Sequence, residues 1–93
     1  MEITFDPAKN QRNIELRGIP FERAADFEFE TALTWLDQRK AYGEDRWIAL
    51  GYLGERLHVL CYLEKPDGIR VISLRKANER EGRTYDQAQA DDR

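Results

Sequence analysis

The sequence predicts an α+β domain, in which two helices precede an antiparallel β-meander and one helix follows it. Three observations carry this prediction. Helix-boundary residues enclose the segment from Asp6 to Gly18, a period-two apolar pattern runs from Ala32 to Leu74, and Asn78 precedes another helical stretch. Helices and strands are thus segregated along the chain, which favours α+β over alternating α/β architecture. We expect the helices to cover one sheet face and leave the other free for a partner.

The first part of the chain is expected to form a short strand and two helices. Ile3–Phe5 is the candidate strand, and Asp6-Pro7 is a helix start, with Asp as N-cap and Pro at the first helical position. That helix should end near Arg17, because Gly18 suits the left-handed conformation that closes helices. Apolar residues between 21 and 29 predict a second, short helix.

Four strands are expected next. Period-two alternation covers residues 33–37, 46–53, 56–63 and 69–74. Gly54-Glu55 and Lys65-Pro66-Asp67-Gly68 are turn sequences between the last three segments. Consecutive antiparallel hairpins follow from these short connections.

The end of the chain predicts a last helix and a mobile tail. Asn78 is a suitable N-cap for a helix that runs to about Gln89. Residues 86–93 are acidic and are expected to be mobile. At 93 residues, with no internal repeat or Gly/Pro/Ser-rich linker, the chain is expected to form a single domain over 1–93.

The sequence contains no apolar run long enough for a membrane helix and no basic segment followed by a signal stretch. A cytoplasmic location is therefore expected. Cys61 and His58 are the only residues of their types. They exclude an internal disulfide and make a poor metal site, so we expect no metal and no cofactor. Being three apart in a strand, they face opposite ways, which excludes a Cys-His nucleophilic pair.

Positive charge is concentrated late in the chain. The formal net charge is −3 overall, which alone argues against a nucleic-acid binder. Residues 1–68 carry nine basic and thirteen acidic side chains, whereas residues 69–85 carry five basic and two acidic ones. The late segment therefore offers a local basic patch.

Several strings resemble one known family. They are Phe5-Asp6-x-x-Lys9-x-x-x-Asn13, Arg17-Gly18-Ile19-x-Phe21, Gly43-Glu44-Asp45-Arg46, and Ile69-Arg70-Val71-Ile72-Ser73-Leu74-Arg75-Lys76-Ala77 with Glu81 and Tyr85. In order and spacing they are similar to BrnT ribonuclease toxins of type II toxin-antitoxin pairs. The resemblance spans residues 3–85, and its most specific part is 70–85.

This resemblance implies a RelE-like fold and a ribonuclease that restrains translation. It also implies a BrnA-type antitoxin as partner in a hetero-oligomer, with operator DNA bound only through the antitoxin. Two departures stand out: the family usually has Trp at Phe5, and Lys-His-Gly at Leu16-Arg17-Gly18. Arg17 can hold a phosphate but is a poor base at neutral pH.

Metal-independent RNA cleavage requires deprotonation of a 2′-hydroxyl, neutralisation of the phosphorane and stabilisation of the leaving 5′-oxygen. Arginines bind phosphate bidentately, so Arg46, Arg70 and Arg75 are candidate catalytic residues. Tyr85 joins them because it shares a helix face with Glu81, a candidate base. The alternative is structural: arginines on a solvated or ion-paired strand, and a tyrosine in the core.

Other side chains are candidates for RNA contact. Lys9 and Arg17 lie on one polar stripe of the first helix, and Lys76 follows Arg75 at the point where the strand meets the last helix. Such a stripe more often faces only water. Glu44 is a second possible proton acceptor. The aromatic residues of the predicted strands, Trp35, Trp47, Tyr52 and Tyr62, could stack bases, although such residues more often pack in the core.

Two functions follow. The first is a toxin that cleaves RNA as a metal-independent endoribonuclease to inhibit translation and is neutralised by its antitoxin. The alternative is a catalytically weak antitoxin-binding protein that acts as a transcriptional corepressor, which Arg17 and the acidic net charge favour.

Overall fold

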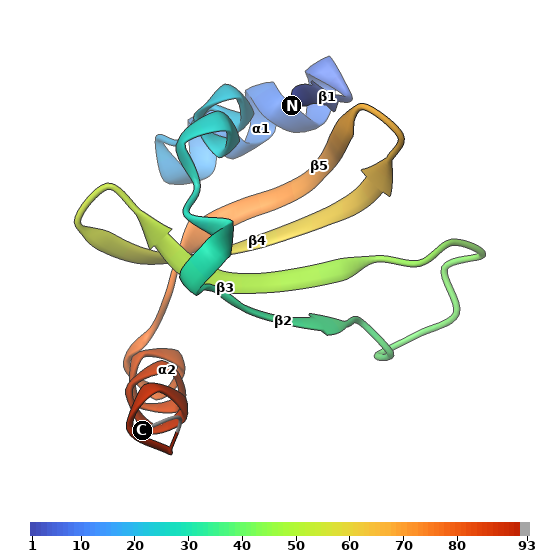
Figure 1. Cartoon of the computed structure of the whole chain (residues 1–93). Coiled ribbons are helices and arrows are strands. Elements are labelled where there is room, and N and C mark those ends of the chain that lie inside the picture. Colours follow the sequence, from blue (N-terminus) through green and yellow to red (C-terminus); the bar gives the residue numbers. More distant parts are fainter. Residues whose placement is uncertain (92–93) are drawn as a thin grey trace.

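The computed structural model describes residues 1–91 and contains one five-stranded sheet in the order β1-β5-β4-β3-β2 (Figure 1). The strands are β1 (Glu2–Phe5), β2 (Leu33–Leu36), β3 (Trp47–Leu53), β4 (Arg56–Lys65) and β5 (Gly68–Lys76). Strands β2 to β5 form the predicted antiparallel meander. Strand β1 pairs with β5 in parallel, so the sheet is mixed and the prediction of an antiparallel sheet is wrong at this edge.

The parallel pairing joins the two ends of the domain. Glu2 is in register with Gly68, and Phe5 with Val71. A Cβ atom at Gly68 would collide with the backbone of Glu2, so glycine is needed for this close approach. Because the two strands are far apart in sequence, no local pattern predicts that they pair.

The helices are α1 (Pro7–Arg17), the 3-10 helices η1 (Phe21–Asp26) and η2 (Phe29–Thr31), and α2 (Glu79–Asp91). Helix α1 has both predicted caps: the Asp6 carboxylate accepts the Ala8 N–H at 2.9 Å, and Gly18 has φ 70°. The predicted second α-helix is instead 3-10. Its six residues end at Asp26, and the next residue, Phe27, bridges to Leu53 of β3, so the chain must return to the sheet before an α-helix can develop.

One face of the sheet, here the closed face, is covered by α1 and η1 (Figure 1). Its central side chains are Ala49, Leu60, Tyr62, Val71 and Leu74, and Phe21 and Ala24 of η1 pack onto them. Leu60, Leu74 and Ala24 are fully buried. This layer is the main hydrophobic core of the domain.

The opposite face carries a smaller core, at one end only. Tyr85 of α2 packs there with Ile48, Leu50 and Val59. Figure 1 shows α2 on the side of the sheet away from α1. The expectation that all helices share one face is therefore wrong, because the backbone of Ala77 bonds to Leu57 at 3.0 Å and directs α2 across the other side.

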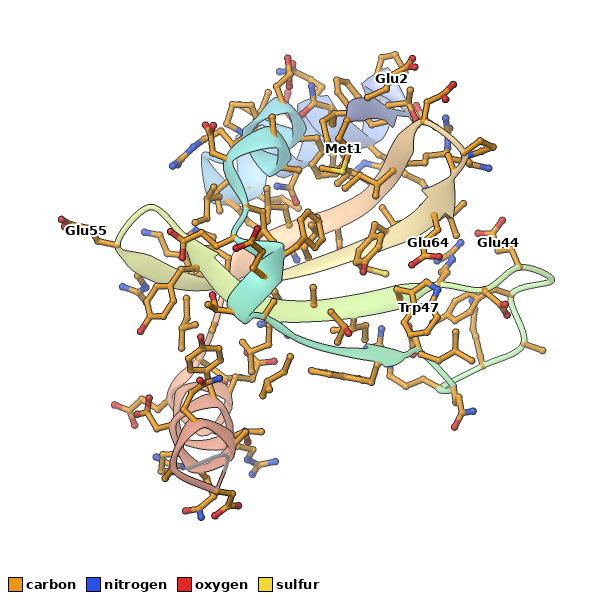
Figure 2. All side chains as sticks on the ribbon, in the orientation of Figure 1. Met1, Glu2, Glu44, Trp47, Glu55 and Glu64 are labelled. Carbon is orange, nitrogen blue, oxygen red and sulfur yellow. The ribbon has the colours of Figure 1, made fainter. Side chains whose placement is uncertain are left out.

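The β3–β4 hairpin runs along the length of the sheet, so its tip and the segment between β2 and β3 lie at opposite ends. Glu55 lies at the tip of the β3–β4 hairpin, while Glu44, in the segment that connects β2 and β3, lies at the far end (Figure 2).

Residues 86–91 of the predicted tail lie in α2, and the remainder, 92–93, lies outside the described residues. Within residues 1–91, no helix is both long and apolar enough to cross a bilayer.

Candidate active site

A β-bulge brings two predicted site residues to the same face of the sheet. Arg70 pairs with Leu63 and Arg75 pairs with Val59, but between these pairs the register shifts and Ile72 is an extra residue in β5. Strict alternation would place Arg70 and Arg75, five apart, on opposite faces. The bulge places both on the face opposite the closed face. We call this the arginine face.

Arg75 is held by the first turn of α2. Its guanidinium donates to both carboxylate oxygens of Glu81, at 2.8 and 2.7 Å. Glu81 also accepts the Asn78 N–H at 2.9 Å, while the Asn78 side chain accepts the Glu81 N–H at 2.8 Å, which is a reciprocal capping box. The hydrogen bonds raise the pKa of Arg75 and lower the pKa of Glu81. Both groups are therefore ionised, and the helix cap fixes the direction of Arg75.

The segment between β2 and β3 adds an arginine that the sequence did not single out. Arg39 donates from Nε and Nη2 to the two carboxylate oxygens of Asp37, both at 2.8 Å, and the Tyr42 hydroxyl donates to Asp37 at 3.0 Å. The Asp37 side chain is 1% exposed, whereas Arg39 is 74% exposed. Hydrogen bonding from Arg39 holds the pKa of Asp37 well below its usual range. Asp37 is thus a buried anchor that presents Arg39 to solvent.

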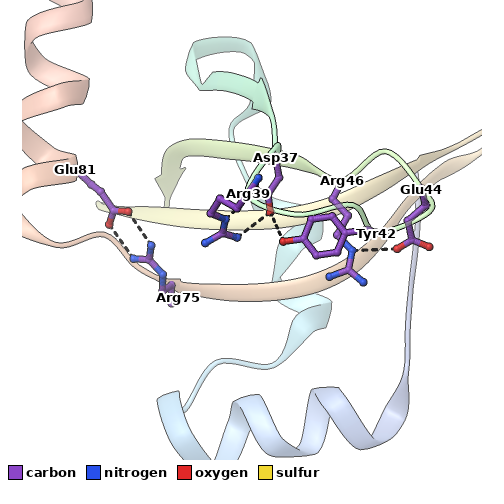
Figure 3. A network of polar contacts seen from close by, with 7 residues as sticks. All are labelled: Asp37, Arg39, Tyr42, Glu44, Arg46, Arg75 and Glu81. Atoms are coloured by element: carbon purple, nitrogen blue, oxygen red, sulfur yellow. Dashed lines mark hydrogen bonds and ion pairs between the residues drawn. The ribbon is translucent and has the colours of Figure 1, made fainter.

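Arg46 completes the row. Its Nε donates to Glu44 at 3.0 Å, and its guanidinium lies 4.1 Å from the centre of the Tyr42 ring. Figure 3 shows the ion pairs and Tyr42 in one line, from Glu81 at one end to Glu44 at the other. The row therefore joins α2 to the segment between β2 and β3, across the arginine face.

Beneath the row lie small and apolar side chains. Cys61 is 6% exposed and Ile48 is 8% exposed, and burial raises the pKa of the Cys61 thiol. Cys61 is therefore an apolar part of the floor, as the alternation predicts. His58 is 3% exposed and pairs with Lys76 on the closed face, and burial lowers its pKa. The structure separates Cys61 and His58, as expected from their spacing.

Tyr85 lies away from this row. It is 5% exposed, its hydroxyl donates to the Thr31 carbonyl at 3.0 Å, and its ring packs against Tyr52 with centroids 5.6 Å apart. Glu81 and Tyr85 do share one side of α2, but only Glu81 reaches the arginines. This placement gives Tyr85 a packing role.

Lys9 and Arg17 border a shallow pocket of about 190 Å³ between α1 and the bulge of β5, whose lining includes Ile72 and Ser73. Asn13, between them on α1, is 4% exposed and donates to the carbonyls of Ile19 and Leu74, both at 2.9 Å. Arg17 donates to Asn13 at 2.7 Å. The polar stripe therefore touches β5, but from its edge and not from the arginine face.

Lys76 does not join either group. Strand β5 continues to Lys76, which is in register with His58, whereas Arg75 is in register with Val59. Successive residues of a strand point to opposite faces, so Lys76 lies on the closed face and Arg75 on the arginine face.

Among residues 1–91, no group of three or more His, Cys, Asp or Glu side chains has the arrangement of a metal site.

Sequence reasoning missed Asp37, Arg39 and Tyr42. The alternation places Asp37 only as the last residue of the predicted strand 33–37, and Arg39 and Tyr42 lie in the segment after β2, whose irregular backbone gives no period to interpret. A signal was available: an Asp directly after a strand, with Arg two residues on, can close a local bidentate pair. The pattern Asp37-x-Arg39 therefore identifies the anchor once the end of β2 is known.

Comparisons of this chain with known proteins match the part of the sequence that builds the row. The family model for "Ribonuclease toxin, BrnT, of type II toxin-antitoxin system" matches residues 5–81, which include every residue of the row. The solved structure of the Brucella abortus ribonuclease toxin BrnT is 28% identical, covers 85% of this chain and 99% of its own, and has a TM-score of 0.67. No curated protein matches.

Proposed function

This chain belongs to the BrnT family of ribonuclease toxins of type II toxin-antitoxin systems, and on that premise we propose that it is a metal-independent endoribonuclease that cleaves RNA on its arginine face. The observation that carries the proposal is the bulge at Ile72, which directs Arg70 and Arg75 to one side of the sheet. Arg46 and the unpredicted Arg39 join them there.

The proposed cleavage depends on guanidinium groups that bind the phosphate and neutralise the negative charge of the phosphorane. Attack of a 2′-hydroxyl oxygen on the adjacent phosphorus forms a phosphorane, and the bond to the 5′-oxygen then breaks. Arg75 and Arg39 are ionised throughout, so both neutralise the growing negative charge. Each guanidinium already binds a carboxylate bidentately, and phosphate oxygens offer the same geometry. We propose that a phosphate of the RNA replaces the partly exposed Glu81 carboxylate as the partner of Arg75, while Asp37 continues to hold Arg39.

Glu81 is our candidate for the proton acceptor. It lies against Arg75, so phosphate bound by Arg75 has this carboxylate beside it. While the ion pair is closed, Arg75 lowers the pKa of Glu81. Transfer of Arg75 to phosphate removes that effect and makes Glu81 a better base for the 2′-hydroxyl proton. The 5′-oxygen takes its proton from water.

Lys9 and Arg17 are proposed to hold a flanking phosphate. Their pocket contains Arg12 as well, and none of its lining residues is acidic. Ser73 lines this pocket and lies in β5 between Arg70 and Arg75, so a strand of RNA that leaves the arginine face over β5 reaches it. Lys76, on the closed face, is proposed only as a long-range positive charge.

The remaining parts of the proposal concern the cell. A BrnA-type antitoxin is proposed to cover the arginine face in a hetero-oligomer and to bind operator DNA itself. Free toxin would act in the cytoplasm and inhibit translation by cutting messages.

The fold class is also part of the proposal. Helices α1 and η1 cover one face of the sheet and the arginines lie on the other, an arrangement that supports assignment to the RelE-like class.

The test is cleavage of labelled RNA in EDTA by the purified chain, with and without the protein encoded beside it. Arg75→Ala should abolish cutting, while Arg23→Ala, an exposed arginine of η1, is the matched control and should cut normally. The proposal requires cutting that persists in EDTA and stops when the neighbour is added. Dependence on a divalent ion would contradict it.

One observation favours the second function, a corepressor with weak catalysis. Arg39, Arg46 and Arg75 each bind a carboxylate of the chain itself, so the row is electrically satisfied without RNA. Arg17 also stands where the family resemblance places a histidine. A folded chain that binds the protein encoded beside it but cuts no RNA would favour this function, and Arg17→His is the substitution that should then restore cleavage.

A further inference from the structure

One aromatic ring of the sheet is exposed, while its counterparts are packed. Trp35, on edge strand β2, is 43% exposed. Tyr62 is 5% exposed in the closed-face core, Trp47 packs against that core, and Tyr52 packs edge-on against Tyr85. Among residues 1–91, the Trp35 ring contacts no other aromatic ring and no cation. Its indole is therefore free to stack on a ligand.

The register places this ring on the arginine face. Trp35 is paired through β3 with Cys61 of β4, and Cys61 with Ser73 of β5, so the four positions form one row across the sheet. That row runs between the positions of Arg70 and Arg75. Strands lie about 4.8 Å apart, so Trp35 is roughly 14 Å from β5.

Trp35 also lies next to the anchor of Arg39. Asp37 follows it by two residues on the same side of the chain, and Asp37 holds the exposed Arg39 guanidinium. A cation for phosphate and a flat ring for a base thus come from neighbouring positions of one segment. Single-stranded nucleic acid presents the same alternation of charge and ring.

We propose that Trp35 is a base-stacking platform for single-stranded RNA, which positions the nucleotide next to the phosphate held by the arginines. This inference rests on the proposed function. Stacking on an indole tolerates any base, because every base has a π-face. The ring should therefore contribute to affinity and to placement of the strand more than to choice of sequence.

The surroundings favour RNA over a protein partner at this position. A protein anchor normally lies in a contiguous apolar patch. Ile48 and Cys61, the neighbours of Trp35 in its row, are only 8% and 6% exposed, so the ring is the sole apolar surface that this row presents. Arg70, on the same face, has no carboxylate within ion-pair distance among residues 1–91. Charge complementarity therefore points to phosphate.

The experiment measures binding of a short 2′-O-methyl oligouridine, which cannot be cleaved, with one abasic site placed at each position in turn. One position should weaken binding to the wild-type chain about tenfold. Trp35→Leu should bind the intact strand about tenfold more weakly and lose nothing further at that abasic position. Trp35→Phe should keep most of the coupling. Trp47→Phe, which alters the other tryptophan, is the matched control and should bind like wild type.

An equal abasic penalty in the wild-type chain and in Trp35→Leu would overturn the stacking role. So would a Trp35→Leu chain that binds the strand normally but binds the neighbour-encoded protein more weakly, which would assign the ring to that partner. If RNA is cleaved and Arg75→Ala abolishes cleavage while no coupling is found, only the Trp35 inference fails. A chain that neither binds the strand nor cuts RNA overturns the proposed function as well.

Discussion

The two faces of the sheet are built from the same four antiparallel strands but stabilised in different ways. The closed face is apolar and complete, with Leu60 and Leu74 fully buried under α1 and η1. The arginine face has a small apolar core at the α2 end, and elsewhere carries ion pairs over a floor of Ile48 and Cys61. Half-exposed ion pairs contribute little to stability. Fold stability and surface chemistry are thus divided between the faces.

The division teaches how to distinguish structural from functional substitutions in this chain. Removing an apolar side chain from the closed face should reduce the free energy of unfolding with no specific effect on chemistry. Removing an arginine from the other face should leave the fold and change the chemistry. Each prediction below would break or sharpen that distinction, in order of decreasing effect.

Phe21→Ala should have the largest effect. Phe21 is 1% exposed and packs edge-on against Phe5, with ring centroids 5.8 Å apart. The cavity and the lost burial should reduce the free energy of unfolding by about 3–5 kcal/mol, measured by urea denaturation. A loss below about 1 kcal/mol would mean that the closed face is not the main core.

Arg75→Ala should reduce RNA cleavage about 100-fold or more, because one preorganised cationic donor is lost from the transition state. The free energy of unfolding should change by less than about 1 kcal/mol, since the pair with Glu81 is partly exposed. Arg75→Lys keeps the charge but not the bidentate fork, so it should recover only part of the activity. Equal losses of stability and activity would contradict the division between faces.

Tyr85→Phe tests whether the one predicted catalytic residue that lies in the core has any chemical role. The lost hydrogen bond to the Thr31 carbonyl should reduce the free energy of unfolding by about 1 kcal/mol. Cleavage should be unchanged at a temperature where the variant is folded. A tenfold fall in cleavage at unchanged stability would instead support a catalytic role for this hydroxyl.

His58 should give the smallest effect, a pH dependence of stability. Burial lowers the pKa of His58 in the folded chain, so below about pH 6.5, its ordinary pKa, the unfolded chain binds more protons than the folded one. Stability should therefore fall as the pH drops below about 6.5. In His58→Gln that part of the slope should vanish in chemical denaturation between pH 5 and 8. An unchanged slope would show that His58 is protonated equally in both states.

The sequence predicted the features that local chemistry determines. Asp6 and Gly18 define α1, and the Gly54 and Pro66 turns define the hairpins, because each acts on its immediate neighbours. Pairing of β1 with β5 depends instead on tertiary contacts between distant segments. The 3-10 geometry of η1 follows from where Phe27 must meet Leu53.

The candidate site was predicted in part for the same reason. Arg46, Arg70 and Arg75 were identified by type and resemblance, but alternation alone would have separated Arg70 from Arg75. Arg39 escaped prediction because its position depends on Asp37 in an irregular segment. Side chains in regular elements could be placed from the sequence, whereas those governed by a bulge or a loop could not.

The extra residue at position 72 shifts the register of β5 against β4 by one residue, and so sets the face on which every later side chain of β5 lies. If Ile72 were paired with Cys61 in unbroken register, alternation would continue through β5 and every later side chain would exchange sides. Lys76 would then lie on the arginine face in place of Arg75, Leu74 would leave the closed-face core, and α2 would start from the wrong side of the sheet. The bulge at this single position therefore determines both which charges lie on the arginine face and which side chain fills the core.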